Sequence, residues 1–467
     1  MCPVMEQLTK IVSEINGFLW GMYCLIPLLC GVGIYFTLKL DFIQIRRFGL
    51  AVKSKFFGEM NLRGGAQKSG MTSFQALATA IAAQVGTGNI VGASGAILTG
   101  GPGAIFWMWI IAFFGMATIY AEATLAQKTR IVEPDGNIKG GPVYYITTAF
   151  KGGFGKFLAG FFAVSIILAL GFMGCMVQSN SIADAFQTAF SLPPLLIGVI
   201  ISALAAFVFF GGMGRIAAFT EKVVPIMAAL YLLGGLIVLL ANASHIIPAL
   251  KMVFVGAFDP AAATGGIIGA GVKEAMRYGV ARGLFSNEAG MGSTPHAHAM
   301  AKVEKPQDQG VVAMVCVFID TFVVLTITAL VMITSGALNV GNMAANPAAE
   351  NMAQVAFSTV FGSFGNFYVA ICLLFFAFST ILSWNLFGKI NANYLFGRKN
   401  SKLCSLIYTI IALVFIFLGT VSGSDFVWEL TDMFNNLIVL PNVIALFALT
   451  GMVIASLNEV QKDKLKV

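Results

Sequence analysis

Long runs of apolar residues occupy most of this chain. A helix needs about 20 apolar residues to cross the hydrocarbon core of a bilayer. We expect helices because alternating ten-residue strand patterns are missing, and an open strand cannot satisfy its backbone groups in lipid. The sequence therefore predicts an all-α integral membrane protein with eleven transmembrane helices, at roughly 17–38, 70–98, 103–128, 155–187, 194–211, 221–241, 263–298, 309–335, 364–396, 403–421 and 433–456.

The composition excludes most soluble classes of protein. Apolar residues make up 58% of the 467 positions and charged residues only 10%, whereas an average soluble protein is about 25% charged. So few charges cannot cover a water-facing surface of this size. The seven cysteines include no Cys-x-x-Cys pair, which argues against a disulfide framework or a zinc site. A cytosolic enzyme, a secreted disulfide scaffold, a disordered hub and a nucleic-acid binder are excluded.

The basic residues alternate with the predicted spans. Lysine and arginine favour cytoplasmic loops, and 23 of the 28 lie in loops on one side, whereas only Lys10 and Lys251 lie in loops on the other. We therefore expect a multi-pass protein of the plasma membrane whose N-terminus is outside and whose C-terminus is cytoplasmic. The net charge of +7 then reflects orientation in the membrane and needs no acidic ligand.

Two spans carry helix-breaking sequences in their middle. One contains A-A-Q-V-G-T-G-N (82–89) and the other F-S-N-E-A-G-M-G-S-T-P (285–295). Each glycine costs a helix about 1 kcal/mol, and amide, hydroxyl or carboxylate groups at membrane depth are costly and usually functional. Glycines that only pack helices together are the alternative. Broken helices in corresponding positions of two halves indicate a transporter site.

The two breaks lie five spans apart, which predicts an internal repeat. Residues 70–241 and 263–456 would each contribute five helices, and the second half would enter the membrane from the opposite side. The chain 1–467 is then one transporter domain, with an extra helix at 17–38 before a five-plus-five inverted repeat. Amides freed at such breaks can hold a carboxylate, and freed carbonyls can coordinate a small cation.

Three motifs resemble those of one transporter family. They are G-T-G-N-I-V-G (86–92), G-G-P-G-A-I-F-W-M-W-I (100–110) and S-N-E-A-G-M-G-S (286–293). Over nearly its whole length the chain is similar to the alanine or glycine:cation symporters. The resemblance implies a fold of the leucine-transporter type. It also implies uptake of small neutral amino acids driven by sodium or protons, without any other cofactor.

The resemblance implies a substrate site between the two breaks. Backbone amides of the first break would bind the substrate carboxylate, and Gln84 would contact its carboxylate or ammonium group. Asn287 and Gly290 would form the opposite wall, and Trp384 would close the pocket. Phe172, beside a glycine of the fourth span, is a candidate for the apolar wall. The candidate substrate-binding residues are Gln84, Gly86, Thr87, Gly88, Asn89, Asn287, Gly290, Trp384 and Phe172.

A sodium site is also implied by the resemblance. The carbonyls of Ala82 and Val85 and the hydroxyls of Ser379 and Thr380 would coordinate the ion. An alanine at position 83 argues against a second sodium site, which in some relatives of the fold would want an amide there.

Structural alternatives stand beside these assignments. The two hydroxyls of the ninth span could instead bond to their own helix. Trp384 and Phe172 could be packing residues, and Gln84 could be purely structural.

Other polar groups of the spans are weaker candidates. Glu288 is a candidate for proton or cation coupling, and we expect Asp320 to pair with a hydroxyl or a backbone group. Glu122 lies near a span end, where we expect water. His296 and His298 lack further metal ligands nearby in the sequence, so we expect interfacial histidines rather than a metal site.

The leading hypothesis is a secondary symporter that imports alanine, glycine or another small neutral amino acid with sodium. Its partners are the amino acid, the ion and membrane lipid. Within the transporter class, glutamine or serine is the alternative substrate and the proton the alternative ion. A channel is disfavoured because the repeat and its central breaks do not suggest a continuous pore. An enzyme is disfavoured because no catalytic constellation or phosphate loop is found.

Overall fold

Helices form almost all of the described chain. The structure is a computed structural model that describes residues 3–20, 24–50, 52, 70–134, 138–259, 271–339, 345–397 and 400–464. The start of the predicted seventh span (263–270) and several basic loop residues, among them Lys53, Arg63, Arg398 and Lys399, lie outside these ranges.

The helices of the first half follow the predicted spans closely. The first break separates two helices that are bent by 45°. The segments are α5 (Ser73–Gln84), η2 (Gly88–Gly92), α6 (Ala93–Gly100), α7 (Ala104–Thr129), α9 (Gly152–Ile166), η3 (Ile167–Gly174), α10 (Cys175–Phe190), α11 (Pro194–Phe209) and α12 (Gly212–Ala241).

The second half has a matching order of long helices. Its first span is also broken, between α15 and the short α16. The segments are α15 (Val272–Asn287), α16 (Pro295–Met300), α17 (Pro306–Val317), η5 (Phe318–Leu325), α18 (Thr326–Thr334), α20 (Phe364–Phe396), α21 (Ser401–Val421) and α22 (Ser424–Ala448).

Length and hydropathy alone identify fewer spans than the sequence prediction. Within the described ranges, seven helices are long and apolar enough to cross a membrane, or eight if the broken pair α5 and α6 is one span. Three of the predicted spans fail this test. The helices α2 (Leu25–Lys39) and α11 have only 15 and 16 residues, and α15 carries Lys273, Glu274, Arg277 and Arg282.

The prediction of one continuous first span at 17–38 is wrong. The structure has α1 (Pro3–Leu19) and then α2, which begins at Leu25. Pro27 is the third residue of α2. Proline lacks an N–H and its ring clashes with the carbonyl four residues earlier, so it fits best in the first turn of a helix and costs free energy in the interior. The helix therefore begins just before Pro27.

Within the described ranges, three stretches of π-helix interrupt the long spans: η2, η3 and η5. Such π segments are rare and are found frequently at functional sites. Here η2 follows the first break directly, while η3 and η5 lie within the spans that run from Gly152 to Phe190 and from Pro306 to Thr334. The irregular helix geometry therefore collects around the two breaks.

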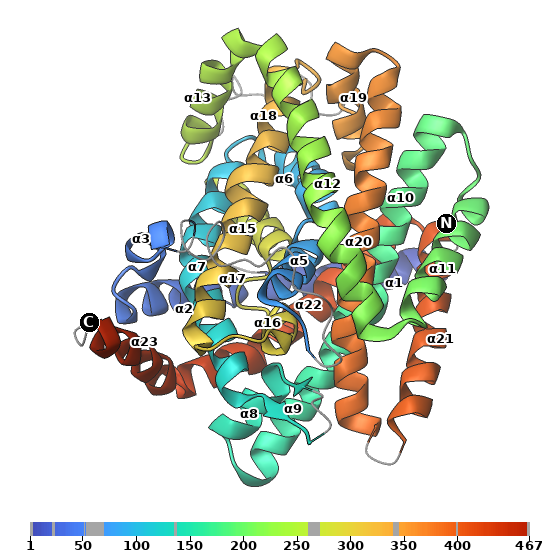
Figure 1. Ribbon diagram of the computed structural model, residues 1–467. Helices are drawn as coiled ribbons and strands as arrows, with labels where there is room; N and C mark the ends of the chain where they lie inside the picture. The colour runs from blue at the N-terminus through green and yellow to red at the C-terminus, as the bar shows by residue number, and fades with distance from the viewer. Residues whose placement is uncertain are drawn as a thin grey trace.

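Short elements connect the long helices, and several of them lie at the two ends of the bundle. In Figure 1, α8 lies at the lower end, whereas α13 and α19 lie at the upper end. Before α8 comes a small antiparallel hairpin in which Ile131 pairs with Lys139. These elements are α3 (Ile43–Arg46), α4 (Phe48–Leu50), β1 (Ile131–Val132), β2 (Ile138–Lys139), α8 (Pro142–Ala149), η4 (Ala243–His245), α13 (Ile246–Gly256), α19 (Ala349–Phe361) and α23 (Thr450–Lys464).

Glycines allow α15 to approach α7 closely. A Cβ atom at Gly279 would lie 2.4 Å from the carbonyl oxygen of Ala104, and one at Gly283 would lie 2.8 Å from Cγ2 of Ile111. The four-residue spacing places both glycines on one face of α15. This is the small-residue packing typical of membrane helices, and it fixes the broken span against α7.

We expect Gly279→Val to destabilise the protein by about 1–3 kcal/mol, because the new side chain would overlap the backbone of α7. Gly160→Val is the matched control, since it lies inside α9 with no atom within 4 Å of its Cβ position. Denaturant unfolding of the purified protein, followed by tryptophan fluorescence, measures the difference. Equal stability of the two variants would contradict this packing.

Candidate functional site

The two breaks meet at the centre of the bundle. The Gln84 side chain, at the end of α5, donates to the carbonyl of Asn287 at the end of α15, with 2.6 Å between Nε2 and O. A Cβ atom at Gly88 would lie 3.2 Å from Cα of Ser286. These residues are all buried. The structure therefore brings together two segments that lie about 200 positions apart in the sequence.

Side chains satisfy the amides of the first break. The N–H of Gly86 donates to Oδ1 of Asn89 at 3.0 Å, and the N–H of Thr87 donates to Oε1 of Gln178 at 3.1 Å. The Thr87 hydroxyl donates to the same oxygen of Gln178. The amide oxygen of Gln178 thus accepts from both the backbone N–H and the hydroxyl of Thr87.

The Thr380 hydroxyl lies among three backbone carbonyls. Its Oγ1 is 2.7 Å from the oxygen of Ala82, 3.5 Å from that of Val85 and 3.0 Å from that of Phe376. A Cβ atom at Gly86 would lie 2.5 Å from this hydroxyl. Only glycine at that position lets α20 approach the break so closely.

Ser379 points elsewhere on the same helix. Its hydroxyl donates to the carbonyl of Phe376 at 2.9 Å and lies 3.5 Å from the sulfur of Met227. The two neighbouring hydroxyls of α20 therefore share one carbonyl, but only that of Thr380 contacts the break.

Asp320, in η5, joins both breaks through its carboxylate. Asn89 donates to it at 2.7 Å, Ser286 at 3.0 Å and Thr321 at 2.7 Å. The side chain is fully buried. Pairing with hydroxyl groups was the expectation from the sequence, and it is confirmed. The carboxylate oxygens need these donors because a buried charge is very costly without partners.

The second break is an irregular turn with three left-handed residues. Glu288 has a φ angle of 57°, Gly290 of 95° and Gly292 of 78°. Glycine adopts such angles readily, whereas they are uncommon for other residues. The turn ends at Pro295, the first residue of α16, where a missing N–H costs nothing.

Glu122 of α7 binds the backbone of this turn. Its carboxylate accepts from the N–H of Gly290 at 3.2 Å and from that of Gly292 at 3.0 Å. Asn442 of α22 donates to the same carboxylate and to the carbonyl of Gly290. Glu122 is fully buried, so the expectation that it would lie in water near a span end is wrong. The position of a residue near the end of a predicted span therefore does not determine how deeply its side chain is buried.

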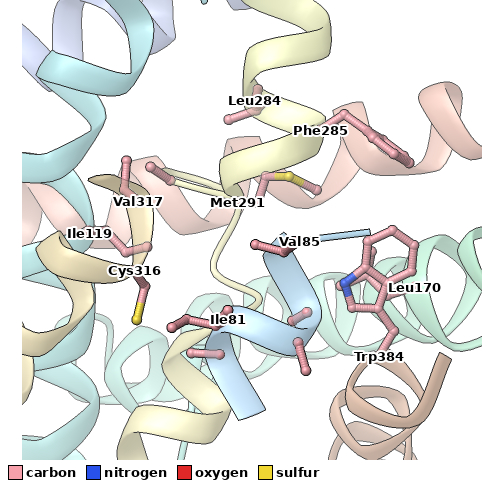
Figure 2. Packing of buried hydrophobic residues seen from close by; sticks show 14 of the residues in the cluster. Ile81, Val85, Ile119, Leu170, Leu284, Phe285, Met291, Cys316, Val317 and Trp384 are labelled. Atoms are coloured by element: carbon pink, nitrogen blue, oxygen red, sulfur yellow. The ribbon is translucent and has the colours of Figure 1, made fainter. Parts of the chain in front are cut away.

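Glu288 connects the second break to α20. Its carboxylate accepts from the indole N–H of Trp384 and from the hydroxyl of Ser293. The Trp384 ring packs edge to face on Phe285, with 5.8 Å between the ring centroids. Figure 2 shows Phe285 near the end of α15, Val85 at the end of α5 and Trp384 on α20, gathered around the breaks.

Comparison with known proteins decides the family. The model of the sodium:alanine symporter family matches residues 5–466. The chain is 40% identical to the sodium/alanine symporter AgcS of Methanococcus maripaludis, over 98% of this chain and 99% of that protein. The chain belongs to the sodium:alanine symporter family. It is also 37% identical to a probable sodium/glutamine symporter, GlnT of Bacillus subtilis, over 98% of this chain and 92% of that one.

Solved structures agree on the fold of this family member. The crystal structure of MhsT in complex with L-phenylalanine has a TM-score of 0.55 at 16% identity, and the match covers 83% of this chain and 89% of that one. A manganese transporter of Eremococcus coleocola has a TM-score of 0.51 at 16% identity, over 78% of this chain and 75% of that one. The symporter therefore has helical neighbours of the leucine-transporter type. It is a transporter and not an enzyme.

Most predicted site residues of the symporter lie together at the breaks, but Phe172 does not. Its ring stacks on Tyr408 and Phe415, with centroids 5.6 Å and 4.8 Å away. These partners belong to α21, on the far side of η3 from the breaks. The hydropathy of Phe172 gave no information on which face of its helix would meet the site.

Two histidines expected at the membrane interface are buried instead. His296 bonds to the carbonyl of Ser293 at 2.7 Å and to Asn391 at 2.8 Å, and His298 bonds to Gln309 at 2.8 Å. Among the described residues, no group of His, Cys, Asp or Glu side chains could hold a metal ion with three ligands. The two rings therefore act as packed, hydrogen-bonded core residues of the symporter.

Gln178 and Glu122 are the contacts of the breaks that sequence reasoning missed. Gln178 offered a signal, because it is a carboxamide inside the apolar fourth span, where polar groups are costly. Glu122 offered the same signal, but its position near the end of its span concealed it.

Glu122→Ala should destabilise the symporter by about 2 kcal/mol or more, because two buried N–H groups would lose their acceptor. Glu122→Gln keeps one carbonyl acceptor and should fall between that variant and the parent protein. The control is Glu459→Ala, whose exposed pair with Lys128 contributes little. Denaturant unfolding measures all three variants. Parent-like stability of Glu122→Ala would show that the turn does not depend on this carboxylate.

Proposed function

We propose that this protein imports a small neutral amino acid, alanine or glycine, together with sodium. The observation that carries the proposal is the position of the Thr380 hydroxyl among the carbonyls of Ala82, Val85 and Phe376. Carbonyl and hydroxyl oxygens are the hard ligands that small cations of this kind prefer. The proposed sodium ligands are the carbonyls of Ala82 and Val85 and the hydroxyl of Thr380, to which the geometry adds the Phe376 carbonyl. Ser379, the fourth ligand expected from the sequence, instead turns its hydroxyl toward Met227.

The amino acid is proposed to bind beside this ion, between the two breaks. Gln84 supports the position, because its Oε1 is buried and, within the described part of the chain, accepts no hydrogen bond. A buried acceptor without a donor is costly, and an ammonium group would supply the donor. The amides of Gly86, Thr87 and Gly88 follow directly in the chain, and a substrate carboxylate would replace Asn89 and Gln178 as the acceptor of the first two.

The small size of the proposed substrate follows from the closure of this region. Gly174, in η3, lies against Trp384, and a Cβ atom there would be 2.6 Å from Cζ3 of the indole ring. Trp384 in turn contacts Phe285 and Glu288. A substrate pocket bounded by these packed side chains would favour a short side chain such as that of alanine.

The proposed topology has eleven spans. The eight candidates by length and hydropathy, together with α2, α11 and the charged α15, give this number. A pair of five-helix halves with inverted orientation accounts for the matching breaks in α5 and α15. The alternation of basic loops supports an outside N-terminus and a cytoplasmic C-terminus.

Sodium coupling also supplies the energy for uptake. One charge that moves through 100 mV releases about 2.3 kcal/mol. At about 1.4 kcal/mol for each tenfold ratio, the membrane potential alone supports roughly 50-fold accumulation of a neutral amino acid.

Glutamine is the second candidate substrate, because a relative with 37% identity is a probable sodium/glutamine symporter. Competition separates the candidates. Unlabelled alanine, glycine, serine and glutamine are each added to proteoliposomes that take up labelled alanine under a sodium gradient or a proton gradient. Stronger inhibition by glutamine than by alanine would replace the proposed substrate.

Thr380→Ala should raise the sodium concentration for half-maximal uptake about 10- to 100-fold, because a polar contact with a charged group contributes about 1.5–3 kcal/mol. Ser379→Ala is the matched neighbour and should have a smaller effect, since its hydroxyl does not contact the break. Sodium titrations of alanine uptake measure both. A normal titration for Thr380→Ala would remove the proposed ion site.

Gln84→Ala should weaken alanine binding at least tenfold if Oε1 accepts from the substrate ammonium group, and it should lower stability by about 1–3 kcal/mol because the buried carbonyl of Asn287 loses its donor. Gln75→Ala is the control, because Gln75 lies at the opposite end of α5 from Gln84. Its side chain donates to Glu221. Equilibrium binding of labelled alanine at saturating sodium is the measurement. Unchanged binding in Gln84→Ala would mean that the residue is structural.

A further inference from the structure

An apolar cavity of about 490 Å³ lies apart from the breaks, between η3, the end of α20 and α21. Phe172 and Ala392 line its inner wall, and Leu403, Ile407 and Ile411 line it along α21. Its volume is within the range of about 300–1,000 Å³ that is usual for small-molecule sites. None of the proposed transport steps uses this cavity.

One wall of the cavity runs along α21. Leu403, Ile407 and Ile411 are spaced by four residues, so they form one stripe along α21. Eight residues of helix cover about 12 Å, which is close to half of the roughly 30 Å hydrocarbon core. One end of the cavity lies at Asn400, where α21 begins, and the other reaches Phe172 within η3.

The opening of the cavity faces lipid. Leu403 and Ile407 are exposed by 51% and 50%, and Ile411 by 40%. In a protein that spans a membrane, such apolar side chains meet acyl chains and not water. An acyl chain is therefore the apolar ligand with direct access to this cavity.

The described residues near the polar end of the cavity include two lysines. Lys389 on α20 and Lys402 on α21 lie close to Asn400 in the sequence, which has no acidic residue between Glu350 and Asp425. In Figure 1 the lower ends of α20 and α21 lie at the same end of the bundle as α8, which is the proposed cytoplasmic side. Basic pockets between helices on this side suit anionic lipid head groups.

We propose that this cavity binds one acyl chain of an anionic phospholipid, whose head group lies at Asn400 and is attracted by Lys389 and Lys402. The charge of these two lysines and the length of the apolar stripe together select a lipid of the cytoplasmic leaflet. The occupant is a lipid rather than a soluble apolar metabolite, because the cavity opens within the hydrocarbon region.

The walls of this lipid cavity are connected to the breaks. Tyr408 stacks on Phe172 and donates to the carbonyl of Asn385 on α20 at 3.2 Å. Trp384 directly precedes Asn385 in the chain, and its indole N–H donates to Glu288 in the second break. A bound acyl chain would hold η3 and Tyr408 against α20 and so stabilise the closed position of Trp384. The lipid therefore sets the rate of uptake; this step depends on the proposed transport function.

A pair of substitutions on α21 tests the site. Ile407→Trp should fill the cavity, whereas Ile410→Trp places the same bulk on the same helix outside it, and both parent residues are 50% exposed. Delipidated protein is titrated with dioleoyl phosphatidylglycerol or dioleoyl phosphatidylcholine, and native mass spectrometry counts the bound lipids. We expect Ile407→Trp to bind phosphatidylglycerol at least fivefold more weakly than the parent and Ile410→Trp to bind it normally. Equal binding by the two variants would overturn the proposal.

The head group is tested by charge. Lys402→Gln should reduce the preference for phosphatidylglycerol over phosphatidylcholine, and Lys251→Gln, in α13 at the other end of the bundle, should not. An unchanged preference in Lys402→Gln and in the double variant with Lys389→Gln would overturn the anionic part of the proposal.

Uptake separates bound lipid from surface charge. Sodium-driven alanine uptake by the parent should increase several-fold when phosphatidylglycerol is added to phosphatidylethanolamine vesicles, and Ile407→Trp should lose this increase. An equal increase in both would indicate a surface-charge effect only and overturn the link to transport. Absence of sodium-driven uptake by the parent in every vesicle would contradict the proposed function instead, while the binding measurement would still decide the lipid site.

Discussion

The backbone groups freed at the two breaks are the constraint on which the rest of this structure depends. In the hydrocarbon region an amide or carbonyl without a partner costs several kcal/mol, so an irregular segment persists only where protein groups bind it. Gln178 provides the acceptor for Thr87, and Glu122 provides it for Gly290 and Gly292. These partners come from α10 and α7, which surround the broken spans. The breaks are therefore held in shape by the bundle.

Carboxylates supply much of this support, and each is used differently. Glu122 binds backbone N–H groups, Asp320 binds side chains from both breaks, and Glu288 binds Trp384 of α20. All three are fully buried, whereas Asp432 pairs with Arg282 at 2.9 Å. A buried acid with only neutral partners has to gain enough from hydrogen bonds to offset its lost hydration. Such groups respond strongly to any movement of the segments that they join.

The sequence predicted the order of the helices well because a bilayer imposes a strong and simple length requirement. It also located both breaks, since glycine combined with polar groups is expensive inside a span. The sequence prediction failed where one residue determines where a helix begins or which way a side chain points. Pro27 ends the continuity of the predicted first span, and the direction of Phe172 depends on helix rotation around η3.

The contacts of the breaks were harder to predict than the breaks themselves. Gln178 and Glu122 meet the broken segments from helices far away in sequence, and no periodic pattern encodes such a meeting. The same limit applies to Gln84, whose partner Asn287 is known only from the fold. Local chemistry identified which residues were costly, but tertiary packing decided which of them meet.

The arrangement at the first break gives a physical reason for coupling between ion and amino acid. Val85 contributes its carbonyl to Thr380 of α20, and the two amides that follow it in the chain, those of Gly86 and Thr87, donate to Asn89 and Gln178. A cation that draws the Val85 carbonyl toward Thr380 therefore also fixes the orientation of the amides of Gly86 and Thr87. Two ligands that order one flexible segment each reduce the entropy that the other has to lose. By linkage the effect is reciprocal, so the amino acid would also strengthen binding of the ion, and neither would bind as well alone.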